Sequence, residues 1–257
     1  MSKKILVVPD VHGRIFWREP VLKYLDQVDR VVFLGDYFDP YDDEDGVAED
    51  ILANMVQILR LKLKNMNKVV LLKGNHDQHY SSSYFRKCSG SSRCDEANWQ
   101  VYHGLFERFK SLFQLVLLDE VRGKKYLFSH AGLTSYWINK VNYHIWNLVD
   151  SRISVTDEDI IDRINALDDS DAGQEMLSTV GKYRSVFGEK TGSVLWADIR
   201  EHPLSDGPKR YGLDKVFQVF GHTRLDGKTE DMLLFDHLAM VDTQKCFMID
   251  DGIESVK

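Results

Sequence analysis

Residues 31–39 read VVFLGDYFD, a run of four apolar residues that ends directly in a glycine and two nearby carboxylates. The same order occurs at residues 5–13, which read ILVVPDVHG. Short apolar runs rich in β-branched residues are typical of strands that are buried on both faces. The two segments therefore predict two buried strands, each ending in side chains that can carry chemistry.

Further runs of the same kind extend this pattern along the chain. Helical spacing of apolar residues between the first three runs, from Trp17 to Tyr24 and from Val47 to Leu63, predicts two crossover helices. Strands that alternate with helices form a parallel sheet with right-handed crossovers. The remaining strand-length runs are Val69–Leu72, Leu115–Leu118, Tyr126–Phe128, Val216–Phe220, Leu233–Phe235 and Cys246–Ile249.

The length and composition predict one folded domain over residues 1–257. The chain has 257 residues, of which 43% are hydrophobic, which is enough for one large core. From about residue 133 to residue 194 the spacing becomes helical with polar interruptions. We expect this segment to be a mostly helical elaboration of the domain.

Charge and cysteine content exclude several classes of protein. The formal charge of −7 disfavours binding of long nucleic acids, which requires neutralisation of phosphates. Three cysteines cannot form a disulfide framework, as expected of a reducing compartment. The four apolar residues after Lys4 are too few for a signal peptide, and no run approaches the roughly 18 residues of a membrane span. We therefore expect a cytoplasmic protein without a membrane partner.

Five of the predicted strands are followed at once by side chains that can bind a metal. Taken singly, each segment is compatible with a polar turn or a hydrogen-bonded core histidine. The carboxyl ends of strands in one sheet converge, however, and several such groups at one place would repel one another without a cation. The recurrence favours a metal site. The segments are Asp10-Val11-His12, Gly35-Asp36-Tyr37-Phe38-Asp39, Gly74-Asn75-His76-Asp77, His130-Ala131-Gly132 and Gly221-His222.

This ordered set resembles the calcineurin-like metallophosphoesterase superfamily. Val194–Asp198, which reads VLWAD, and Met240–Thr243, which reads MVDT, resemble segments of its phosphoprotein phosphatase branch. The resemblance extends from residue 5 to about residue 243. It implies an α/β fold, a four-layer αββα sandwich of two mixed β-sheets flanked by helices.

The resemblance also implies a centre with two divalent metal ions. Asp10, His12 and Asp36 would hold one ion, and Asp36 would bridge to the second. The ligands of the second ion would be Asp36, Asn75, His130 and His222. Oxygen and imidazole ligands without thiolate suit Mn, Fe or Zn, and Mn²⁺ is the expected ion. A hydroxide between the ions would then attack the phosphate ester.

Two further residues have implied catalytic roles. His76 would protonate the leaving-group oxygen, and Asp39 would hold the imidazole in one orientation. The sequence departs from the branch at Pro40-Tyr41, where protein phosphatases carry Arg-Gly and use the arginine to bind phosphate. Arg14 and Arg224 are the nearest candidates to bind phosphate instead.

These features together predict a metallophosphoesterase, and the substrate is less well defined than the chemistry. We expect a phosphomonoesterase of serine/threonine protein phosphatase type, acting on a phosphoprotein or a small phosphoester. Arg224 stands where phosphodiesterase branches carry a second histidine ligand, which argues against those branches. Two alternatives are a dinucleoside polyphosphate hydrolase and a non-catalytic scaffold of the same fold. The oligomeric state is not addressed by the sequence.

Overall fold

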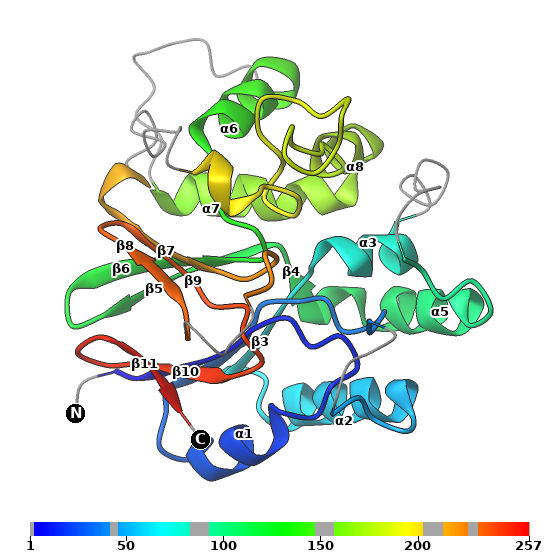
Figure 1. The fold of residues 1–257 in the computed structure, drawn as a ribbon, viewed down its shortest axis with the longest axis vertical. Helices are drawn as coiled ribbons and strands as arrows, with labels where there is room; N and C mark the ends of the chain where they lie inside the picture. The colour runs from blue at the N-terminus through cyan, green and yellow to red at the C-terminus, as the bar shows by residue number, and fades with distance from the viewer. Residues whose placement is uncertain are drawn as a thin grey trace.

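Two β-sheets stack face to face, with helices over both outer faces, in the computed structural model of the chain (Figure 1). It describes residues 3–41, 46–82, 93–146, 157–202, 213–225 and 231–256. The first sheet has the strand order β11-β10-β1-β2-β3-β4. Its strands are β1 (Ile5–Val8), β2 (Arg30–Phe33), β3 (Val69–Leu72), β4 (Phe113–Gln114), β10 (Cys246–Ile249) and β11 (Ile253–Val256).

The centre of the first sheet is the parallel unit that the sequence predicts. β1 pairs with β2, which pairs with β3, and all three run in the same direction. Helices α1 (Arg18–Tyr24) and α2 (Ile51–Lys64) form the crossovers and cover the outer face (Figure 1). The side chain of Asp50 caps α2 by accepting a hydrogen bond from the Ala53 amide at 2.8 Å. β10 pairs antiparallel with β1, so the sheet is mixed.

The second sheet is also mixed and has the order β5-β6-β7-β9-β8. β6, β7 and β9 are parallel, whereas β5 and β8 pair antiparallel at the two edges. The strands are β5 (Val116–Val121), β6 (Lys124–Ser129), β7 (Phe217–Phe220), β8 (Leu233–Phe235) and β9 (Leu238–Met240).

Alternation along β1 shows how the layers pack. Leu6 and Val8 pack into the core under the helices of the first sheet, whereas Ile5 and Val7 pack between the two sheets. Because a strand directs successive side chains to opposite faces, a strand with helices on one face and a sheet on the other must be apolar throughout. The predicted sandwich of two mixed sheets flanked by helices is therefore confirmed.

Helices α6 (Ser135–Val141), α7 (Asp157–Ala166) and α8 (Asp171–Leu177) lie over the outer face of the second sheet (Figure 1). The buried Trp137 indole links two of them by donating to the Met176 carbonyl at 2.9 Å. The expected helical elaboration from 133 to 194 contains these helices, while residues 147–156 lie outside the described part. From 178 to 194 the chain forms turns and irregular structure. No helix within the described ranges is long and apolar enough to cross a membrane.

The structure differs from the predicted elements at several points. The predicted strand Leu115–Leu118 corresponds to β5, which begins at Val116 and continues to Val121, while the short strand β4 just before it belongs to the first sheet. β4, β9 and β11 were not predicted, and neither were helices α3 (Asn75–Ser81) and α5 (Trp99–Phe109). The sequence of α3 is NHDQHYS, a polar segment that is nevertheless almost wholly buried. It has no apolar stripe from which a helix could be predicted.

Close contact between the loops after β2 and β3 depends on Gly35. Its φ of +110° lies in the region that favours glycine, and an added Cβ would lie 2.3 Å from the Gly74 nitrogen. We expect Gly35→Ala to lower the free energy of unfolding by at least about 2 kcal/mol, measured by urea denaturation. Gly104→Ala is the matched control, because Gly104 lies in α5 with nothing near the added Cβ. It should raise stability by roughly 0.5–1 kcal/mol, and equal effects of the two changes would contradict the argument.

Candidate metal centre

The loops that follow the strands are joined by backbone hydrogen bonds, so the predicted ligands meet at one edge of the sandwich. The His12 amide donates to the Asp36 carbonyl at 2.5 Å and the Gly13 amide to the Tyr37 carbonyl at 2.9 Å. In the second sheet the Gly221 amide donates to the His130 carbonyl at 2.8 Å. The positions of the loops are therefore fixed by main-chain pairing that continues from the strands.

Four of the predicted site residues have a left-handed backbone conformation. The φ angles are +45° at His12, +52° at Asp36, +59° at Asp39 and +67° at His222. Such angles cost a non-glycine residue about 1–3 kcal/mol, although Asp and His adopt them more readily than most. They persist where the surrounding structure fixes the backbone, and they cluster at functional sites. This strain marks the loops as a functional region, independently of the side chains that they carry.

The Asp36 carboxylate lies at the centre of the cluster. Its Oδ1 accepts a hydrogen bond from the His76 amide at 2.9 Å. Its Oδ2 lies 3.4 Å from His12 Nε2 on one side and 3.5 Å from His130 Nε2 on the other. Among the described residues, two groups of possible metal ligands result, Asp10-His12-Asp36 and Asp36-His130-His222, each with its ligand atoms within 4.8 Å of one another. The two groups share Asp36.

Backbone carbonyls orient two of the histidines toward the cluster. His12 Nδ1 lies 2.9 Å from the Phe38 carbonyl oxygen, and His130 Nδ1 lies 3.0 Å from the Leu34 carbonyl oxygen. A carbonyl can only accept, so each Nδ1 carries the proton and each Nε2 presents a lone pair. Burial lowers the pKa of both imidazoles, that of His12 to about 3. Both are therefore neutral, the form that binds metal.

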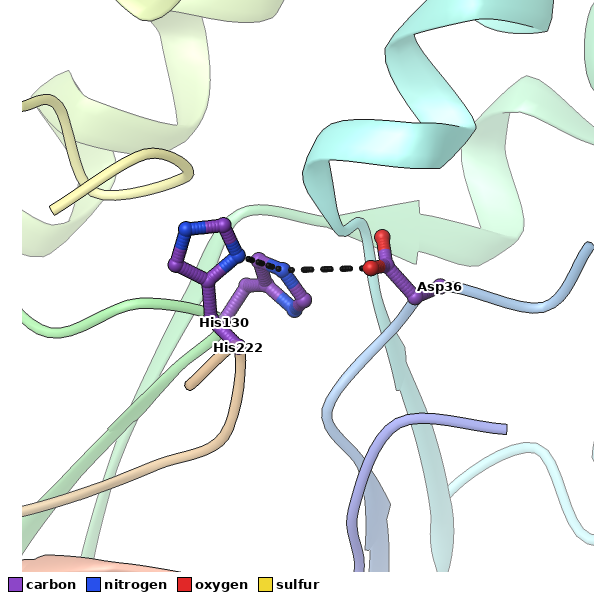
Figure 2. Close-up of side chains that lie close together, drawn as sticks. All are labelled: Asp36, His130 and His222. Carbon is purple, nitrogen blue, oxygen red and sulfur yellow. Dashed lines mark hydrogen bonds and ion pairs between the residues drawn. The ribbon is translucent and has the colours of Figure 1, made fainter. Parts of the chain in front are cut away.

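Two oxygen acceptors and a second imidazole lie close to the lone pair of His130. Asn75 Oδ1 lies 2.8 Å from His130 Nε2, His222 Nδ1 lies at 3.1 Å, and Asp36 Oδ2 lies at 3.5 Å. Figure 2 shows the His130 ring linked to both His222 and Asp36. A carboxylate and an amide oxygen close to an imidazole lone pair repel it unless a cation lies among them. The arrangement therefore fits a bound cation.

The surroundings of the Asp10 carboxylate also fit a bound cation. Both oxygens of Asp10 lie 3.1 Å from the His222 amide nitrogen. The pKa of Asp10 is raised well above its usual value by burial and by the nearby charges of Asp242 and Asp36. Two buried carboxylates that repel each other are stabilised by divalent cations, and the oxygen and nitrogen donors without thiolate fit Mn, Fe or Zn. The residues present thus fit the metal ions that the sequence predicts.

His76 and Asp39 form a hydrogen-bonded pair beside this cluster. His76 Nδ1 lies 2.9 Å from Asp39 Oδ2, and the Tyr80 hydroxyl donates to the other oxygen of the same carboxylate. Burial lowers the pKa of His76, but the charges of Asp36 and Asp39 more than offset this, so the pKa is raised overall. The His76 ring lies 5.1 Å from the His12 ring, between centroids. An imidazole held in this way can transfer a proton at Nε2 next to the metal ligands.

Sequence reasoning gave no role to two residues that hold these groups in place. The Asp77 carboxylate accepts hydrogen bonds from the amides of Gly74 and Asp36 at 2.8 Å and from the Tyr37 amide at 3.0 Å, which joins the loops after β2 and β3. Tyr80 lies one helical turn after His76, and this spacing could have revealed it if α3 had been predicted.

The structure places the two predicted phosphate-binding arginines in different surroundings. Arg14 is buried, and its guanidinium donates to the carbonyls of Val11 at 3.0 Å and Asp10 at 2.5 Å. Arg224 is exposed, and its guanidinium carbon lies 4.9 Å from the centroid of the Tyr41 ring. Arg14 therefore supports the loop that carries Asp10 and His12, whereas Arg224 lies at the surface near the rim.

Comparison with known proteins agrees with the fold. A sequence profile described as calcineurin-like phosphoesterase matches residues 3–224. "Shewanella-like protein phosphatase 1" of Plasmodium berghei (strain Anka) is 24% identical over 273 residues, covering 93% of this chain. The chain spans 66% of the length of that relative, just under two thirds. A Saccharomyces cerevisiae protein serine/threonine phosphatase with similarity to human phosphatase PP5 has the same fold, with a TM-score of 0.51 at 16% identity over 99% of this chain and 80% of that one.

The fold and the ligand cluster define a metal-dependent phosphoric ester hydrolase. The chain belongs to the calcineurin-like phosphoesterase family, because the profile covers most of its length. The resemblance inferred from the sequence is thereby confirmed, and a non-catalytic scaffold is disfavoured.

Sharing of Asp36 between the two ligand groups predicts an asymmetric response to mutation. Asp36→Asn should weaken the binding of both metal ions by at least about 100-fold, because it removes a ligand charge from both groups. Asn75→Ala should weaken one ion and leave the other bound. Metal content per chain, measured by elemental analysis after gel filtration, distinguishes the two. Asp39→Asn is the control and should keep both ions, and loss of only one ion from Asp36→Asn would refute the bridging position.

Proposed function

We propose that the chain is a dinuclear metal-dependent phosphomonoesterase of serine/threonine protein phosphatase type. The observation that carries this proposal is the pair of ligand groups that share Asp36, directly beside the hydrogen-bonded pair of His76 and Asp39. Asp10, His12 and Asp36 would hold one ion. The second would be held by Asp36, Asn75, His130 and His222, with Mn²⁺ as the expected ion at both positions and Fe or Zn as alternatives.

The residues of the chain would divide the work of hydrolysis among them. When bound, two divalent ions would polarise the phosphoryl group of the substrate and activate a water molecule. His76 would donate its Nε2 proton to the leaving-group oxygen, which is the role that its position beside the ligands supports. Asp39 would keep the imidazole in one tautomer, since its carboxylate accepts from Nδ1. Arg224 would bind phosphate at the surface next to the site. Arg14 would contribute indirectly, because its guanidinium holds the loop that carries Asp10.

The substrate proposal is a phosphoprotein or a small phosphomonoester. It is supported by the relative named as a protein phosphatase and by Arg224 in place of the second histidine ligand of phosphodiesterases. A dinucleoside polyphosphate hydrolase is the alternative, because the segments around Asn75 and His130 are equally similar to that class.

His76→Asn tests the role of the proposed general acid. The variant should keep both metal ions, because His76 belongs to neither ligand group. Its kcat/KM should fall by about 10²–10⁴-fold on phenyl phosphate, whose leaving group needs a proton, and by much less on p-nitrophenyl phosphate. His237→Asn is the control, since His237 is exposed in the turn between β8 and β9. Loss of metal from His76→Asn, or equal losses on both substrates, would show that the residue has another role.

A substrate panel separates the proposed activity from its alternative. The metal-loaded protein should hydrolyse phosphoserine or phosphothreonine peptides and p-nitrophenyl phosphate with a higher kcat/KM than dinucleoside tetraphosphates or bis-p-nitrophenyl phosphate. The expected margin is tenfold or more, or about 1.4 kcal/mol of transition-state stabilisation. A preference for dinucleoside tetraphosphates would replace the proposed function by the alternative.

A further inference from the structure

Arg93 places its guanidinium next to the reactive nitrogen of His76. Arg93 Nη2 lies 3.4 Å from His76 Nε2, the atom proposed to protonate the leaving group. The other terminal nitrogen, Nη1, is buried and has no hydrogen-bond partner among the described residues. Within the described ranges Arg93 forms no ion pair with a carboxylate. A buried guanidinium N–H without a partner is costly, so this group is well suited to bind an anion.

Tyr41 holds this guanidinium in place. The Arg93 guanidinium carbon lies 3.4 Å from the centroid of the Tyr41 ring, which is the distance of direct stacking. The Tyr41 ring in turn lies 5.6 Å from the ring of the metal-ligand candidate His12, between centroids. The position of Arg93 is therefore fixed relative to both His12 and His76.

The backbone after Arg93 is anchored to the same carboxylate that orients His76. The Asp95 amide donates to the Tyr80 hydroxyl at 2.8 Å and contacts Asp39 Oδ1 at 3.3 Å. Arg93 is thus restrained at two points. The backbone that follows it is anchored to Asp39 and Tyr80, and its guanidinium stacks on Tyr41. Such a restrained arginine loses little conformational entropy when it binds.

We propose that Arg93 binds the phosphoryl group of the substrate and of the product phosphate, with Tyr41 as its positioning residue. This inference rests on the proposed function, because it needs a phosphoryl group between the metal ions and His76. The guanidinium fork matches two phosphoryl oxygens, and such charge-assisted hydrogen bonds are about twice as strong as neutral ones. Protein phosphatases carry Arg-Gly where this chain has Pro40-Tyr41. Tyr41 provides an aromatic surface at this position, and the cation comes from Arg93 instead.

Arg93 fits this role better than the arginines predicted from the sequence. The guanidinium of Arg14 is directed to the carbonyls of Val11 and Asp10. Arg224 lies farther from the Tyr41 ring, at 4.9 Å, and is exposed, so water competes more strongly for its hydrogen bonds. Arg93 alone of the three makes a contact with the proposed proton donor among the described residues.

The test measures binding of inorganic phosphate and of vanadate to the Mn²⁺-loaded protein by titration calorimetry, alongside metal content and kcat and KM for p-nitrophenyl phosphate. Arg93→Ala should weaken phosphate binding by about 10–100-fold with both metal ions retained. Arg93→Lys should recover part of the affinity, because it keeps the charge and loses the fork. Arg60→Ala, which changes an exposed arginine on α2, is the control and should leave all values unchanged.

Variants of Tyr41 test the positioning role. Tyr41→Phe keeps the aromatic face and should retain phosphate affinity within about twofold. Tyr41→Ala should lower phosphate affinity nearly as much as Arg93→Ala does. The effect of Tyr41→Ala should also vanish when Arg93 is already alanine.

The outcomes separate this inference from the proposed function. Unchanged phosphate affinity in Arg93→Ala, or loss of metal from that variant, would overturn the role of Arg93 while wild-type hydrolysis still supports the proposed function. A wild-type protein that neither takes up metal nor hydrolyses phosphomonoesters would overturn the proposed function and this inference with it.

Discussion

The site depends on one buried carboxylate, that of Asp36, which is 2% exposed. A carboxylate removed from water is stable only if its charge is compensated by hydrogen bonds, by cations or by both. One oxygen accepts from the His76 amide, and the other faces two imidazole lone pairs that cannot donate to it. The remaining compensation has to come from positive charge placed between Asp36 and these histidines. The neutral histidines, the raised pKa of Asp10 and the oxygen acceptors beside His130 agree with this requirement.

The four-layer core makes this arrangement possible. β1 and β2 are buried by helices on one face and by the second sheet on the other, so their carboxyl ends have little freedom to move. The loops then adopt strained φ angles at positions such as His12 and Asp36. Main-chain pairing and the three amide hydrogen bonds that the Asp77 carboxylate accepts offset the free-energy cost of this strain. The rigidity of the sandwich thus supports the geometry of the ligands.

Much of this could be predicted because the sequence signals are local. The parallel strands follow from their apolar runs, and the candidate metal ligands from their places at the strand ends together with the family resemblance. The residues that were missed act through contacts that a linear pattern does not record. α3 is polar and yet buried, since its side chains serve the site, so neither Tyr80 nor the capping role of Asp77 could be recognised. The change of sheet at Leu115, between β4 and β5, depends on which strands pair with each segment, a property of the tertiary structure. Arg14 lies beside the candidate ligand Asp10, but its place in the sequence did not reveal that its guanidinium is directed to backbone carbonyls.

The departure at Pro40-Tyr41 changes how positive charge reaches the site. An arginine at position 40 would move with the loop of Asp36 and Asp39, whereas Arg93 belongs to the segment that precedes α5. That segment is tied to Asp39 through the Asp95 amide and the Tyr80 hydroxyl, so one carboxylate orients both His76 and the backbone that carries Arg93. The proposed binding of phosphate by Arg93 and the orientation of the His76 imidazole therefore depend on the same contacts. Because contacts in one hydrogen-bond network are not independent, changes at Asp39, Tyr80 and Arg93 should be coupled rather than additive.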